Sequence, residues 1–237
     1  TGTGVTTWAL PISNGIGLGG GLHDFRGIAL LQLSMDGPPD IHARVRGEGT
    51  FDAMQQAVAM ARKAGIPTHL VCVLNRFNVT RLDETLACAA AMKVRVQFQP
   101  MSPVPPSRRG FDASSPEPRD LLAAWDRLAR IRAAGGGAGR FLKNSGSEIA
   151  YYRKLADTGV GEVGCSLVMA TLDPDGQMSF CGRARPHPSH DAVQLGFLEA
   201  FSRLRIPECS GCSCIGRLRF SRLCRLDPNA FWETLRD

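Results

Sequence analysis

The apolar run at residues 28–34 constrains the fold more than any other part of this chain. Its sequence is IALLQLS, in which a single glutamine interrupts the apolar residues before the final serine. A nearly continuous run of this kind is typical of a strand that is buried on both faces of a sheet. Such strands occur where helices cover both faces, so we expect parallel strands that are connected by helices.

Strand and helix patterns alternate through the first half of the chain. Apolar runs predict strands at 5–13, 28–34, 67–74 and 94–98. One helix is expected to begin at a Thr50 cap and to end at Gly65, and a second is expected over 82–92. Strand–helix–strand repeats of this length predict four parallel strands with helices packed outside them, which is an α/β fold.

The alternation stops at Pro100, where a proline-rich loop begins. We expect a helix over 121–134, then the glycine run GGGAG at 135–139 as a boundary between domains, and a further helix over 147–156. The sequence after Gly159 is rich in cysteine, turn residues and arginine. The expected domains are residues 1–134, a linker with its helix at 135–158, and a cysteine-rich domain at 159–237.

Cysteine is the most informative residue type in this chain. Of its eight cysteines, only Cys72 and Cys88 precede the last third, and we interpret these two as core residues. The others are crowded together near the end: Cys165, Cys181, Cys209, Cys212, Cys214 and Cys224. We find no export signal and no run near the roughly 20 apolar residues of a membrane span. Metal ligation is therefore favoured over disulfides.

A glycine-rich turn follows the first expected strand. Gly15, Gly17 and Gly20 satisfy the G-x-G-x-x-G pattern, and Asp36 lies at a later strand end. This pattern is typical of dinucleotide binding, so a nicotinamide-dependent dehydrogenase is one hypothesis. The stretch between Gly21 and Gly27 is too short for a helix that packs on a sheet, and this favours a simple turn.

Polar residues mark the end of the buried strand at 28–34. Ser34 and Asp36 are expected to point to the same side, because side chains alternate along a strand. Ligands bind at the carboxyl ends of parallel strands, so these two side chains are candidates for contacts with a ribose or a carboxylate. Arg44 and Arg46 follow within reach of an anionic group.

The segment SMDGPPDIHARVRGEGTF at 34–51, with KAGIP at 63–67 and VLNRFN at 73–78, resembles the middle of radical S-adenosylmethionine (SAM) enzymes. The resemblance covers residues 5–106 and resumes in the cysteine region. It implies an incomplete (β/α)6 partial TIM barrel in which a 5′-deoxyadenosyl radical, formed from SAM, abstracts hydrogen from substrate. It also implies that Ser34 and Asp36 contact SAM and that Asn75 and Gln99, which line the barrel, are further candidates for binding it.

The sequence departs from this family in one respect. The family's CxxxCxxC loop, which holds the SAM-binding four-iron–four-sulfur (4Fe–4S) cluster, and its GGE segment would both precede Thr1. We therefore expect the chain to be an N-terminally incomplete or processed form, or one whose missing part is supplied elsewhere.

The cysteine spacing predicts a metal centre. Residues 172–180, LDPDGQMSF, predict a hairpin whose flanking residues Cys165 and Cys181 lie together, and Cys209-x2-Cys212 is a common ligand loop. With Gly176, these cysteines resemble the auxiliary-cluster extension (SPASM or twitch) of radical SAM enzymes. The resemblance implies one auxiliary 4Fe–4S cluster, with the ligands taken first from Cys165, Cys181, Cys209 and Cys212 and then from Cys224 and Cys214.

Zinc is the rival metal, because His187 and His190 follow Cys181. The net charge of +6 is partly local to arginines around the last cysteines. We interpret these arginines as balancing an anionic cluster or facing substrate, because few aromatic residues are interleaved as nucleic-acid binding would favour. The resemblance further implies a peptide or small-molecule substrate, an electron donor such as flavodoxin or ferredoxin, and a reducing, cytoplasmic setting. The alternative is an iron–sulfur or zinc-binding scaffold protein without SAM chemistry.

Overall fold

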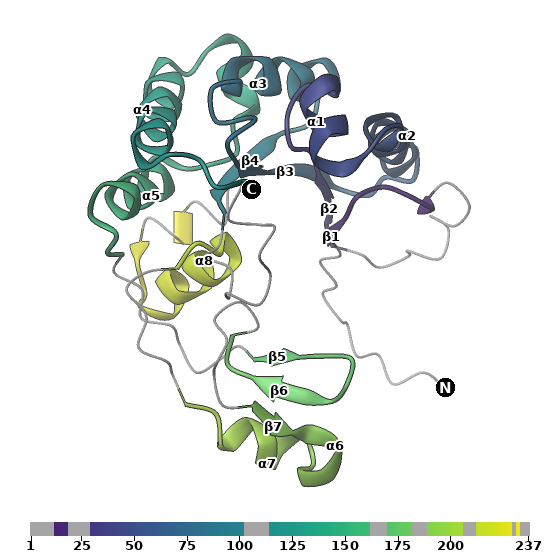
Figure 1. The fold of residues 1–237 in the computed structure, drawn as a ribbon, viewed down its shortest axis with the longest axis vertical. Coiled ribbons are helices and arrows are strands. Elements are labelled where there is room, and N and C mark those ends of the chain that lie inside the picture. The colour runs from purple at the N-terminus through teal and green to yellow at the C-terminus, as the bar shows by residue number, and fades with distance from the viewer. Residues whose placement is uncertain are drawn as a thin grey trace. The chain divides into compact units, whose positions relative to one another are not determined.

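A computed structural model describes the chain in two compact units (Figure 1). The described residues are 12–18, 29–101, 114–161, 170–181, 189–205, 212–228 and 231–232. The first unit comprises Thr1–Gln99 and Pro116–Ala150, and the second comprises Pro100–Ser115 and Tyr151–Asp237.

A four-stranded sheet forms the centre of the first unit. Its strands are β1 (Ile12–Ser13), β2 (Leu31–Ser34), β3 (Thr68–Leu74) and β4 (Val96–Pro100), in the order β1-β2-β3-β4. The pairings of β2 with β1 and with β3 are parallel. The four expected strands and the mixed α/β class are thus confirmed; β2 and β3 begin later than expected, and β4 runs over 96–100 instead of 94–98. Residues 5–11 and 28 lie outside the described residues, and the wider barrel stays a prediction.

Helices α1 (Pro39–Arg46), α2 (Thr50–Lys63) and α3 (Leu82–Ala91) lie together on one side of this sheet (Figure 1). Helix α2 ends as expected before Gly65, whose φ of 69° is easy for a residue without Cβ. The expected Thr50 cap is wrong, because Gly49 is the N-cap and the Thr50 hydroxyl donates to the Gly47 carbonyl. Helix α1, which begins at a proline, was not expected.

The core of the first unit lies between the sheet and these helices. Every residue of β4 is buried, although two of its five residues are glutamines. In β2, for which the apolar run predicts burial on both faces, Leu31 and Leu33 are buried but Gln32 and Ser34 are only half-buried. Helix α4 (Pro118–Ala134) adds the fully buried Trp125. The remaining fully buried large apolar residues include Leu31, Leu33, Met35, Met54, Leu70, Leu74, Leu86 and Phe98.

The glycine run does not separate two domains, which corrects the expected linker. Gly135 ends α4 with a φ of 69°, and a 3-10 helix, η4 (Gly137–Phe141), follows directly. The chain then returns to β4, where the Asn144 side chain accepts from the Phe98 N–H and donates to the Phe98 carbonyl. This segment therefore completes the first unit, and α5 (Gly146–Thr158) continues from it.

The second unit contains a small antiparallel sheet. Its strands β5 (Thr171–Leu172), β6 (Gln177–Ser179) and β7 (Ser189–Asp191) are joined in that order. The Gly176 N–H donates to the Asp173 carbonyl, which confirms the expected hairpin turn. Helices α6 (Ala192–Leu195), α7 (Phe197–Ser202) and α8 (Ile215–Cys224) follow. No helix among the described residues is long and apolar enough to cross a lipid bilayer.

Candidate functional site

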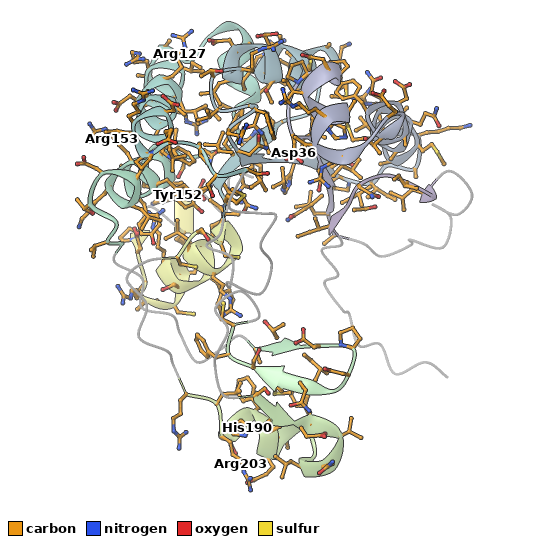
Figure 2. The ribbon with its side chains drawn as sticks, in the orientation of Figure 1. Asp36, Arg127, Tyr152, Arg153, His190 and Arg203 are labelled. Carbon is orange, nitrogen blue, oxygen red and sulfur yellow. The ribbon has the colours of Figure 1, made fainter. Side chains whose placement is uncertain are left out.

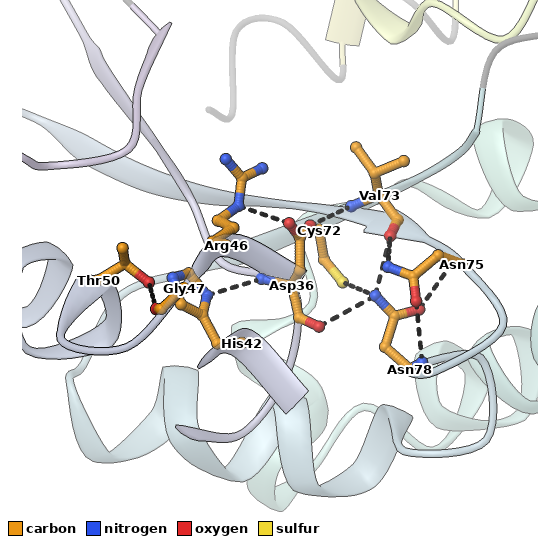
Figure 3. Close-up of polar contacts among 9 residues, drawn as sticks. All are labelled: Asp36, His42, Arg46, Gly47, Thr50, Cys72, Val73, Asn75 and Asn78. Carbon is orange, nitrogen blue, oxygen red and sulfur yellow. Dashed lines mark hydrogen bonds and ion pairs between the residues drawn. The ribbon is translucent and has the colours of Figure 1, made fainter. Parts of the chain in front are cut away.

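Asp36 takes over the hydrogen bonding of β2 where that strand ends (Figure 3). The Met35 N–H still donates to the Val71 carbonyl, as in the β2–β3 ladder. The next donor on β3, the Val73 N–H, is bonded by the Asp36 carboxylate at 3.2 Å instead of by a backbone carbonyl. The side chain of Asp36 is therefore a structural continuation of the sheet, and the residue is only 2% exposed.

The same carboxylate fixes the side chain of Arg46, the last residue of α1. Its second oxygen accepts from the Arg46 Nε–H at 2.5 Å, and the Asp36 side chain is 3% exposed while that of Arg46 is 28% exposed. Among the described residues, Nε is the only Arg46 side-chain atom with a hydrogen bond. The two terminal nitrogens point away from the other side chains drawn in Figure 3. The Arg46 guanidinium is thus fixed through Nε, while its two terminal nitrogens can still donate two parallel hydrogen bonds to a carboxylate.

Two asparagines build the turn that follows β3. The side-chain oxygen Oδ1 of Asn75 accepts from the Phe77 N–H, and the Asn75 side-chain amide donates to the Val73 carbonyl. Asn78 accepts from the Asn75 N–H and donates to the backbone carbonyls of Asp36 and Val73. The structure therefore brings Asp36 and Asn75 together through Asn78, a residue that the sequence patterns did not single out.

The other two expected SAM contacts lie in the same sheet. Ser34 is the last residue of β2 and is half-buried, and its hydroxyl has no hydrogen bond among the described residues. Gln99 is buried in β4 at 8% exposure. All four expected contacts, Ser34, Asp36, Asn75 and Gln99, thus lie at or near strand carboxyl ends, and their contact with SAM stays a prediction.

Cys72 is part of the core beneath this edge. Its side chain is fully buried in β3, and burial raises the pKa of the thiol well above its usual range, an effect to which the nearby Asp36 carboxylate adds. A thiol of this kind stays protonated and is inert. The interpretation of Cys72 as a core residue is therefore confirmed.

The glycine turn has a packing role. Gly15 has a φ of 87°, and a Cβ there would lie 2.8 Å from the Met54 Cα on α2. The N–H groups of Gly15 and Ile16 are bonded to the side chains of Ser13 and Asn14. Donors that would otherwise cradle a phosphate are therefore already used, which argues against the dehydrogenase hypothesis. Gly20 lies outside the described residues.

Four of the six candidate metal ligands lie among the described residues of the second unit. Cys181, Cys212 and Cys214 are half-buried, and Cys224 is exposed. Cys165 and Cys209 lie outside the described residues, as does His187, whereas His190 lies in β7 (Figure 2). No three His, Cys, Asp or Glu side chains of the described residues gather closely enough to hold a metal ion.

Two adjacent tyrosines hold the segment that carries Cys212. The Tyr151 hydroxyl accepts from the Cys212 N–H at 2.9 Å and donates to its carbonyl at 3.2 Å. The Tyr152 hydroxyl donates to the carbonyl of Ser213 at 3.2 Å. One hydroxyl therefore satisfies both backbone groups of a cysteine, which fixes the direction in which its thiol leaves the chain.

Helix α8 connects the remaining cysteines. Arg217 donates to the Phe180 carbonyl at 2.6 Å, directly before Cys181. Cys214 is the N-cap of this helix and Cys224 is its last residue, so their backbones are about 15 Å apart at 1.5 Å per residue. A single metal centre cannot bind both thiolates across that distance. At most one of Cys214 and Cys224 could therefore be a ligand of any single metal centre.

No protein-family model matches the sequence, and no curated protein matches it. Among solved structures, the chain is similar to native anSMEcpe with bound AdoMet and the Kp18Cys peptide, at 18% identity and a TM-score of 0.45, over 66% of this chain. It is also similar to native anSMEcpe with bound AdoMet, at 17% identity and a TM-score of 0.46. The chain spans 45% and 44% of the length of those two structures, respectively.

Proposed function

We propose that this chain is part of a radical SAM enzyme and that SAM binds at the carboxyl edge of the four-stranded sheet. The observation that carries this proposal is the Arg46 side chain, which Asp36 holds by Nε while its two terminal nitrogens are unbonded among the described residues. The motif around these residues, SMDGPPDIHARVRG at 34–47, supports the assignment by its resemblance to the family.

The roles of the residues follow from their contacts. Arg46 would bind the carboxylate of SAM through two parallel N–H bonds, which is the geometry that a guanidinium favours. The Ser34 hydroxyl, which has no hydrogen bond within the described parts of the chain, could bond a ribose or an amino group, and Gln99 is a further candidate on β4. Asp36 and Asn75 would act through the backbone and through Arg46, because the structure already uses their polar atoms.

SAM supplies the radical-forming chemistry of this family. The CxxxCxxC loop that holds its cluster is not in the sequence given, so experiments on this chain address binding and not cleavage. The soft thiols of the second unit fit an auxiliary 4Fe–4S cluster by their chemistry. Cys181 and Cys212 would be ligands with Cys165 and Cys209, and with Cys214 or Cys224 as the alternative. A peptide or small-molecule substrate and a flavodoxin or ferredoxin donor complete the proposal.

Calorimetric titration of the chain with SAM tests the proposal. Arg46→Met removes the cation but keeps most of the apolar stem, and loss of a charge-assisted pair predicts SAM binding weaker by about 10- to 100-fold. Arg44→Met is the matched control, because Arg44 lies on the same helix but stacks on the Phe77 ring at 4.1 Å. Equal affinity of the Arg46→Met variant and the wild type would refute the assignment.

A metal-binding scaffold without SAM chemistry is the second candidate function. The observation in its favour is the pair of tyrosines that fix the Cys212 segment, because this order precedes any ligand. Iron, acid-labile sulfide and zinc measured on anaerobically purified protein separate the two metals. Zinc without sulfide would exclude the auxiliary cluster, and metal binding without SAM affinity would favour the scaffold.

A further inference from the structure

His42 contacts the backbone of Asp36 from within the core. Its ring is fully buried on α1, and its Nδ1 atom accepts the Asp36 N–H at 3.1 Å (Figure 3). The edge of the ring meets the Phe51 ring of α2, with centroids 5.5 Å apart and planes at 78°. An imidazole therefore fills a site that an apolar side chain could fill, but supplies one acceptor there.

The contact with Asp36 determines the charge of the ring. Because Nδ1 accepts a hydrogen bond, a neutral His42 carries its proton on Nε2, which is buried without a hydrogen-bond partner among the described residues. Burying the Nε2–H donor of His42 without a partner is costly. The hydrogen bond that Nδ1 accepts from the Asp36 N–H explains why a histidine is nevertheless found here. A second proton would sit on Nδ1 and point at the Asp36 N–H, and that bond would be lost.

Burial lowers the pKa of His42 below its usual value of 6.5. Two charged groups act on the ring in addition: the Asp36 carboxylate raises this pKa, and the Arg46 guanidinium lowers it. Since the folded state holds the proton less tightly than the unfolded chain, the stabilising contribution is complete above pH 6.5. It is lost as the pH falls from 6.5 towards the folded-state pKa.

We infer that His42 is a positioning residue whose neutral ring holds the Asp36–Arg46 pair in place. The backbone of Asp36 is held on one side by His42 and on the other by Asn78, which donates to its carbonyl. The carboxylate between these two contacts carries Arg46. A consequence for ligand binding, which rests on the proposed function, is that protonation of His42 weakens the binding of SAM.

Amide hydrogen exchange tests the positioning role without any ligand. In the wild type, we expect protection of the Asp36 N–H to be constant above pH 6.5 and to fall about tenfold below it, relative to the Leu70 N–H. Leu70 reports general opening of the same unit, because its N–H is bonded to the Arg95 carbonyl between β3 and the segment before β4.

Two variants separate the acceptor from the ring. His42→Asn keeps an acceptor on the atom equivalent to Nδ1 but does not titrate, so Asp36 protection should lose its pH dependence. His42→Phe keeps the contact with Phe51 but has no acceptor, so protection should be low at every pH. The inference would be overturned if protection of the Asp36 N–H in the wild type did not change with pH. It would also be overturned if the His42→Asn variant kept the pH dependence of the wild type.

Titration with SAM at the same pH values separates this inference from the proposed function. Binding by the wild type should weaken about tenfold together with the protection of Asp36, and binding by His42→Asn should not follow pH in this way. If the wild type binds no SAM at any pH but Asp36 protection behaves as expected, the proposed function fails and the positioning role stands. If SAM binds and the exchange profile is flat, the positioning role fails alone.

Discussion

Replacing Asp36 separates its two structural contacts. Asp36→Asn keeps an oxygen that can accept the Val73 N–H but places an amide opposite Arg46, so only the charge-assisted bond is lost. A fully buried pair that loses one partner costs about 3–5 kcal/mol, and a hydrogen bond to a charged group contributes about 1.5–3 kcal/mol. Because the Arg46 side chain is 28% exposed and can regain water, we expect destabilisation by about 2 kcal/mol.

Asp36→Ala is the matched comparison, because it removes both contacts. The buried Val73 N–H is then left without an acceptor, which adds about 1–3 kcal/mol and brings the expected total to about 4 kcal/mol. Urea unfolding followed by tryptophan fluorescence measures the difference, since Trp125 is fully buried in the first unit while Trp232 is already 60% exposed. Equal destabilisation by the two variants would refute the claim that the carboxylate continues the β2–β3 ladder.

Three further predictions concern other parts of the chain. Gly15→Ala should destabilise by about 2–3 kcal/mol in urea unfolding, because its Cβ would meet the backbone of α2 at a positive φ, whereas Gly17→Ala has open space and should cost only about 1 kcal/mol. Asn144→Ala should cost about 3 kcal/mol in the same assay, because two buried backbone groups of β4 lose their partners, and a loss below 1 kcal/mol would contradict the paired contact. Tyr151→Phe should make Cys212 react about fivefold faster with an alkylating reagent, measured by mass spectrometry, and an unchanged rate would contradict the role of the hydroxyl.

The strands were predictable because their sequence pattern and their environment agree. The apolar run at 28–34 marks β2, and its Leu31 and Leu33 are buried, but Gln32 and Ser34 are half-buried, so the expected burial on both faces holds only in part. Helix α1 was missed because it begins at a proline that follows another proline, and half of its residues are polar. The glycine run at 135–139 was misinterpreted, since glycine marks a turn inside a unit as readily as a linker between units.

The site was predictable in its residue types but not in their partners. Ser34 and Asp36 were recognisable as polar groups at a strand end, where ligands bind, whereas Asn75 was suggested only by the family resemblance. Whether such a group bonds a ligand or the fold depends on contacts with residues far along the chain. Asn78 donates to the carbonyl of Asp36 across 42 positions, and no local spacing indicates such a contact.

The internal contacts of Asp36 are also what would make Arg46 an effective ligand for an anion. A free arginine side chain has about 2 kcal/mol of rotamer entropy to lose when it binds. The bond from Nε to a carboxylate that is itself fixed by β3 restricts Arg46 before any ligand arrives, so less entropy is lost on binding. Weaker SAM binding by an Asp36 variant would therefore report the disorder of Arg46. It would not demonstrate a contact between Asp36 and SAM.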